Sequence, residues 1–130
     1  MEKEFVNYEI ALILKEIGFD EPCFGVYPLN GGDFILCGST ERIRPKIESI
    51  LAPTYSQCFR YFREKYKLQC YPILDTEDVY LCLFSDGIGS GYLLKDGDYG
   101  YESDEFLEFN TYEEAEIECL NELIEIVKNK

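Results

Sequence analysis

Two short connections constrain the fold more than any other feature of this sequence. Two runs rich in aromatic and β-branched residues flank Asn30-Gly31-Gly32-Asp33, and a second pair, LQCYPIL and DVYLCLF, flanks the turn-like DTED. Strands joined this tightly run antiparallel, because a parallel connection needs a crossover of about a dozen residues or more. The sequence therefore predicts two β-hairpins.

Three other segments carry the apolar periodicity and the start signals of helices. Asn7 can cap a first helix, which Gly18 ends. Pro53 suits the first position of a second helix. Thr111 and Glu114 form a capping box at the start of a third helix, which continues to the C-terminal lysines.

The order of elements is helix, two strands, helix, two or three strands, helix. We therefore expect an α+β fold, with an antiparallel sheet of four to five strands and three helices mainly on one face. A chain of 130 residues fits a single domain, residues 1–130. We assign residues 39–51 as a connection. Residues 86–105 are assigned as an acidic, Gly-rich loop with one short strand around residues 92–95.

The residue inventory argues against familiar catalytic and metal sites. The chain has no histidine, which removes the commonest general base and metal ligand. Its six cysteines form no CxxC pair, so neither a zinc site nor a disulfide scaffold is indicated, and Cys82 and Cys119 lie in apolar contexts typical of buried thiols. The acidic loop misses the spacing of a calcium-binding loop. We expect no cofactor, no metal ligands and no catalytic residues.

The first residues, MEKEFVNYEI, lack the apolar core and cleavage site of a secretory signal. No apolar run approaches the length of a membrane span. We therefore expect a cytoplasmic protein without membrane contact.

Charge is distributed unevenly along the chain. The formal net charge is -14, yet residues 42–67 hold seven of the twelve cationic side chains and only two acidic ones. Such contrast can attract an acidic partner or a phosphate. Alternatively, these cations pair with the acidic final helix or the acidic loop of the same fold.

On a helical wheel, this segment separates an apolar stripe from a row of cations. We call Arg60, Arg63 and Lys67 the cationic row, and place Tyr61 on the outer side of the helix as well. Arginine and tyrosine make strong contacts when they are desolvated. Arg60, Tyr61, Arg63 and Lys67 are therefore the candidate binding residues. The apolar stripe consists of Tyr55, Phe59, Phe62 and Tyr66.

Three segments, GFDEPCF (18–24), APTYSQCFRYFREKY (52–66) and YEEAEIECLNELIEIVK (112–128), resemble a family of short uncharacterised proteins encoded by phages and mobile elements of gut bacteria. Members of that family often carry tryptophan where this chain has Tyr61, and the loop at 86–105 resembles an elaboration. The resemblance covers about a third of the chain. It implies a small cytoplasmic accessory protein, and it implies no activity or site residues.

We expect a non-catalytic module that binds another protein, such as a host protein, through the candidate residues or an exposed sheet edge. One alternative is an acidic DNA mimic that uses an outward row of carboxylates on the final helix. Another is a small enzyme with paired carboxylates. Direct nucleic-acid binding is not expected, because the negative field repels phosphates. A homodimer through a strand edge at Tyr27 or Tyr80 stays open. The carboxylate row consists of Glu114, Glu118, Glu122 and Glu125.

Overall fold

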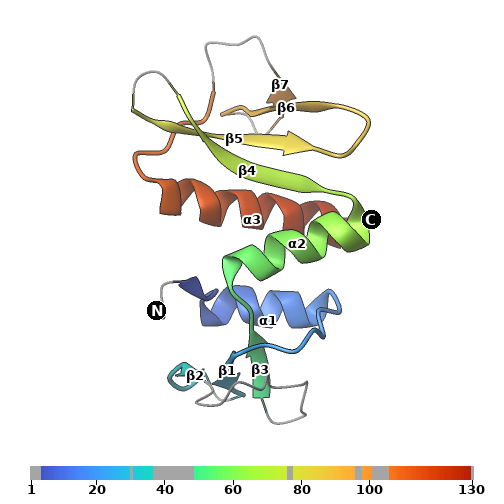
Figure 1. Ribbon diagram of the computed structural model, residues 1–130, viewed down its shortest axis with the longest axis vertical. Helices are drawn as coiled ribbons and strands as arrows, with labels where there is room; N and C mark the ends of the chain where they lie inside the picture. The colour runs from blue at the N-terminus through green and yellow to red at the C-terminus, as the bar shows by residue number, and fades with distance from the viewer. Residues whose placement is uncertain are drawn as a thin grey trace. The chain divides into compact units, whose positions relative to one another are not determined.

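The computed structural model describes residues 4–29, 31–36, 49–75, 78–95, 98–100 and 106–129. These residues form three helices and seven strands, and every strand pairing is antiparallel (Figure 1). The predicted α+β class is thereby confirmed. The chain divides into two compact units, unit 1 (Met1–Cys58) and unit 2 (Phe59–Lys130).

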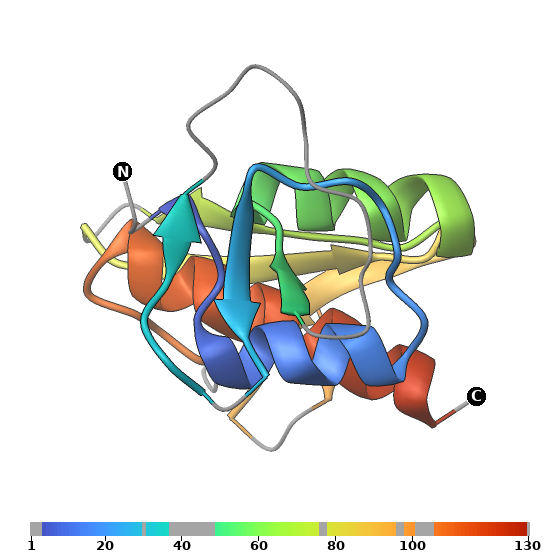
Figure 2. The same cartoon turned by 90° about the horizontal axis from the view of Figure 1, so that it is seen from below.

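Unit 1 combines one helix with a small sheet. The sheet order is β2-β1-β3, from β1 (Gly25–Pro28), β2 (Ile35–Leu36) and β3 (Ser49–Ala52). The helix α1 (Tyr8–Glu16) contacts β3 (Figure 2). The strands β1 and β2 form the first predicted hairpin.

The ends of α1 follow the predicted signals. The Asn7 side chain accepts a hydrogen bond of 2.9 Å from the backbone N–H three residues further on. Gly18 adopts a positive φ of 98°, which glycine reaches without a steric penalty. The N–H groups of Gly18 and Phe19 donate to the carbonyls of Lys15 and Leu14, the bond pair of a Schellman motif.

Unit 2 contains a four-stranded sheet in the order β4-β5-β6-β7. Its strands are β4 (Gln69–Leu74), β5 (Tyr80–Ser85), β6 (Ser90–Leu93) and β7 (Tyr99–Gly100). The helix α3 (Tyr112–Lys128) packs along one face of this sheet, against β4 and β5 (Figure 1). The buried residues of α3 are Ala115, Cys119, Leu120, Leu123 and Ile124.

The helix α2 (Tyr55–Tyr66) begins in unit 1 and ends in unit 2. The Thr54 hydroxyl accepts a hydrogen bond of 3.1 Å from the Gln57 N–H, so the helix starts after Thr54. The prediction that Pro53 is its first residue is wrong. At the other end, Lys67 adopts a positive φ of 61°.

Four expectations about the strands need correction. The strands form two sheets, not one sheet of four to five strands. The strand β3 lies in the segment assigned as a connection, and β7 lies in the segment assigned as a loop. Tyr27 and Tyr80 lie on β1 and β5, which each have a partner strand on both sides, so neither residue marks a sheet edge. Residues 37–48, 96–97 and 101–105 lie outside the described residues.

Candidate functional site

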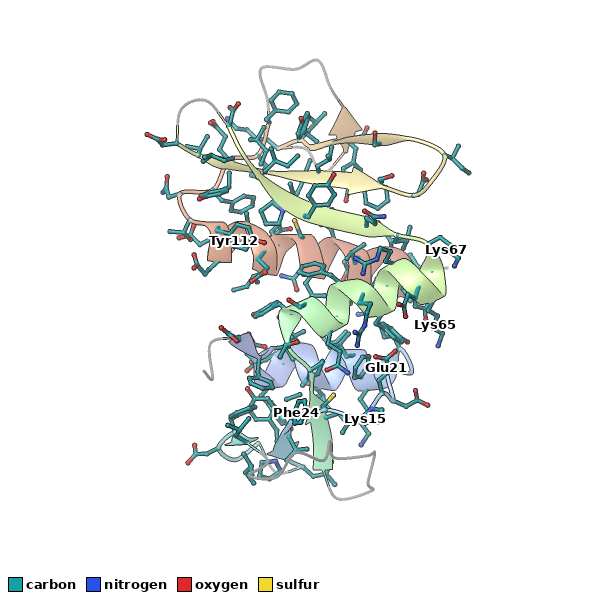
Figure 3. The ribbon with its side chains drawn as sticks, in the orientation of Figure 1. Lys15, Glu21, Phe24, Lys65, Lys67 and Tyr112 are labelled. Atoms are coloured by element: carbon teal, nitrogen blue, oxygen red, sulfur yellow. The ribbon has the colours of Figure 1, made fainter. Side chains whose placement is uncertain are left out.

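The cationic row lies at the surface of unit 2. Arg60 and Arg63 are exposed on α2, and Lys67 is exposed just beyond its end. The Lys67 Nζ donates a hydrogen bond of 3.1 Å to the Glu64 carbonyl of the same helix. Figure 3 shows Lys67 projecting where α2 ends and β4 begins.

The charges of the two arginines are not neutralised inside the described fold. Among the residues that the structure describes, no ion pair or hydrogen bond joins the Arg60 or Arg63 guanidinium to a carboxylate. For Arg60 and Arg63, the alternative of pairing with the acidic final helix is therefore not observed; residues 96–97 and 101–105 of the acidic loop, the other partner considered, lie outside the described residues. Both guanidinium groups can present their planar set of donors to a partner.

The expectation that Tyr61 lies on the outer side of α2 is wrong. Its side chain is only 4% exposed. The ring packs edge-on against Phe62 and Tyr66, and the Lys65 Nζ donates to its hydroxyl at 3.3 Å. Burial is the main cause that raises the pKa of Tyr61. Tyr61 therefore stabilises the inner face of the helix and does not belong to the exposed row.

The buried arc of α2 is rotated relative to the predicted stripe. Cys58 and Phe62 are fully buried, whereas Phe59 and Tyr66 are only half-buried. Cys58, Tyr61 and Phe62 stand at i, i+3 and i+4, which is itself a helical apolar pattern. That spacing was the signal that could have placed Tyr61 inside.

A second polar cluster joins α3 to β7. The Tyr99 hydroxyl donates a hydrogen bond of 2.7 Å to Oε1 of Glu122. Glu118 lies one helical turn before Glu122, and burial, followed by the Glu122 charge, raises the pKa of Glu118. Burial and the bond to Glu122 also raise the pKa of Tyr99. This cluster shows one carboxylate with a raised pKa, Glu118, beside a second carboxylate that accepts the Tyr99 bond.

The carboxylates of α3 do not form the expected outward row. Glu114 and Glu125 are exposed, but Glu118 and Glu122 are half-buried, and Glu122 is engaged by Tyr99. Regularly spaced surface charges are the physical requirement for imitating a phosphate backbone. Glu118 and Glu122, in the middle of the carboxylate row, do not supply such surface charges.

The described cysteines are buried free thiols, as the apolar contexts of Cys82 and Cys119 predicted. Between the unit 2 sheet and α3, Cys119 hydrogen-bonds with Cys70 and Cys82, and these bonds, with burial, raise its pKa. Within the described ranges, no group of three or more cysteine or acidic residues has an arrangement that could hold a metal ion. These thiols pack the interior of unit 2.

Comparisons of the chain with protein-family models, curated proteins and solved structures give no match. The resemblance to phage and mobile-element proteins stays a prediction. In the part of the chain that the structure describes, no helix has the length and apolar character needed to cross a membrane.

Proposed function

We propose that this protein is a non-catalytic binding module that docks an acidic surface of another protein on the cationic row. The observation that carries the proposal is the exposure of Arg60 and Arg63 without an acidic partner among the described residues. Exposed arginines gain most when a partner desolvates them and supplies carboxylates with matching geometry.

A protein partner fits the overall charge better than a nucleic acid. The net charge of -14 repels the phosphate backbone, whose attraction to cations dominates nucleic-acid affinity. A carboxylate that reaches the row directly feels the nearby cations most, because salt screens charges beyond about 8 Å at physiological ionic strength.

The resemblance of residues 18–24, 52–66 and 112–128 to phage and mobile-element proteins supports a cytoplasmic accessory role. In that setting the partner is a host protein. The cationic row then supplies the electrostatic attraction that selects an acidic patch on the surface of the host protein.

The test is affinity capture from host lysate with the wild-type chain and with Arg60→Glu/Arg63→Glu. We expect the double variant to lose the captured partner while its free energy of unfolding stays within about 0.5 kcal/mol of the wild type, because both side chains are exposed. Lys95→Glu/Lys128→Glu is the matched control, since it makes the same change in net charge at exposed positions of unit 2. This control should keep the partner.

Equal loss of the partner in both double variants would show that net charge alone governs capture. A large loss of stability in Arg60→Glu/Arg63→Glu would show that the row is structural. Either result contradicts the proposal.

A further inference from the structure

The sheet of unit 2 has one face against α3 and one face that no helix in the described part of this unit covers (Figure 1). Along β4, Cys70 and Pro72 are buried, whereas Gln69 and Tyr71 are exposed. Because side chains alternate between the faces of a strand, Gln69 and Tyr71 share the face opposite α3.

The strand register shows which side chains adjoin Tyr71 on this face. Tyr71 is paired with Leu83 on β5, and Leu83 is paired with Tyr92 on β6. Paired residues of neighbouring strands lie on the same face, so these three side chains form one line across the sheet, which we call the tyrosine row. Tyr71 is 44% exposed, whereas Leu83 and Tyr92 are half-buried. Tyr71 is therefore the accessible end of the row.

The cationic row and the tyrosine row meet at the start of β4. Lys67 precedes Gln69 by two residues, and Gln69 precedes Tyr71 by two more. Lys67 precedes the strand, and four residues of any chain span at most about 14 Å, so one extended segment of a partner can reach both Lys67 and Tyr71.

An exposed apolar side chain marks the same end of the sheet. Gln69 pairs with Ser85, and the turn that follows carries Ile88, whose side chain is 96% exposed. The Asp86 Oδ1 accepts hydrogen bonds of 2.9 Å from the N–H groups of Ile88 and Gly89, which fixes the turn. The Asp86 carboxylate is thus used within the turn.

We infer that the segment docking on this surface is an acidic peptide that also carries an aromatic side chain, with its carboxylates at Lys67 and its ring on Tyr71. This inference rests on the proposed function and adds the chemistry of the partner. A purely acidic segment would leave Tyr71 in water, and a purely apolar one would cover Lys67 without a counter-charge. Only a mixed segment satisfies both.

The partner contacts the face of the sheet and does not extend it. The edge strand β4 has Pro72 in its middle, and proline lacks the N–H that strand addition requires. Recognition therefore depends on side chains.

The experiment titrates two peptides into the isotope-labelled full chain and follows the amide signals by NMR. The probes are Gly-Glu-Glu-Asp-Phe-Glu-Glu-Asp-Gly and the same peptide with alanine in place of phenylalanine. We expect the phenylalanine peptide to bind about fivefold more tightly, as partial burial of one ring implies. The largest shifts should fall on residues 69–71 and 83.

Tyr71→Ala should make the two affinities equal without abolishing binding. Tyr112→Ala is the matched control, because Tyr112 is also 44% exposed but lies at the start of α3. It should leave the fivefold difference intact. Arg60→Glu/Arg63→Glu should weaken both peptides.

Equal binding of both peptides to the wild type would overturn this inference while the proposed function stands. Absence of binding by either peptide would contradict the proposed function itself. Self-association that Tyr71→Ala removes, measured by analytical ultracentrifugation, would assign the tyrosine row to a second copy of the chain and would also overturn the inference.

Discussion

Lys67 adopts the left-handed backbone conformation, with φ of 61°, although it carries a Cβ atom. A non-glycine residue in this region costs of order 1 kcal/mol. The conformation closes α2, because the Leu68 N–H that follows donates to the Phe62 carbonyl at 3.2 Å. The residue that ends the helix is also a member of the cationic row.

We predict that Lys67→Gly stabilises the fold by about 0.5–1 kcal/mol, because glycine reaches positive φ without a steric penalty. Urea unfolding followed by circular dichroism measures the change. Lys67→Ala is the control, since it removes the same charge but keeps the Cβ, and it should not stabilise. Equal stabilities of the two variants would show that the left-handed conformation costs nothing at Lys67.

A second residue-scale prediction concerns Glu118. Its pKa is raised above the ordinary value of 4.5 by burial and by Glu122. Between pH 4.5, the pKa in the unfolded chain, and the raised pKa of the folded state, the folded state binds more protons than the unfolded state. The free energy of unfolding therefore falls as pH rises through that range. The stability that protonated Glu118 gives the fold, relative to its ionised form, is fully present below pH 4.5 and is lost above the raised pKa.

Glu118→Gln should therefore be more stable than the wild type at pH 7 and equal to it near pH 4. The gain should not exceed about 1 kcal/mol, because solvent screens a half-buried side chain. Urea midpoints measured across this pH range provide the test. Glu125→Gln, at an exposed position of the same helix, should show no such divergence. Parallel curves for Glu118→Gln and the wild type would contradict the assignment.

At the scale of elements, β6 and β7 approach each other closely at Gly91. A Cβ atom there would lie 2.9 Å from the Gly100 nitrogen, which belongs to the backbone and cannot move aside cheaply. We predict that Gly91→Ala costs about 1–3 kcal/mol and raises hydrogen exchange along β7. Gly89→Ala is the control, since a Cβ there meets nothing within 4 Å. Similar effects of both substitutions would contradict the close contact.

The start of α3 supports a further prediction at this scale. The Thr111 hydroxyl accepts a hydrogen bond of 3.1 Å from the Glu114 N–H. Thr111→Ala should cost about 1 kcal/mol, whereas Thr111→Ser should retain most of the stability, because serine keeps the acceptor oxygen. Thermal unfolding of the two variants distinguishes these outcomes. Equal losses would mean that the methyl group, not the oxygen, is responsible.

These elements also show what the sequence could predict. The caps of α1 and α3 depend on contacts within a few residues, so local reasoning found Asn7, Gly18 and Thr111 correctly. The two hairpins followed from their short turns. The strand β3 was missed because its four residues have no partner nearby in sequence and pair with β1 across the chain. The separation of the strands into two sheets likewise depends on pairings that no local pattern encodes.

The candidate site was predicted in part for a similar reason. Periodicity placed Arg60, Arg63 and Lys67 outside, where the structure has them. It misplaced Tyr61 because a helix can bury an arc wider than one stripe, and a tyrosine ring packs well beside other rings. The tyrosine row could not be predicted, since its members come from three strands whose register the sequence does not reveal.

At the scale of the whole molecule, the described thiols are protected by folding. Cys23, Cys58, Cys70, Cys82 and Cys119 are all buried, and Cys37 lies outside the described residues. We predict that the variant Cys37→Ser reacts with an aromatic disulfide reagent no faster than it unfolds. Reaction rates measured with and without urea test this. Rapid modification of the native variant would show that at least one buried thiol is accessible.

The alternation along β4 has a consequence for how this protein could change over time. Gln69 and Tyr71 face outward, whereas Leu68 and Cys70 fill the interior. Substitutions at every second position can therefore alter which partner is recognised, and the intervening positions keep the fold intact. If the partner's surface changes during evolution, the outward-facing residues of β4 can be substituted one at a time, and the protein stays folded at each step.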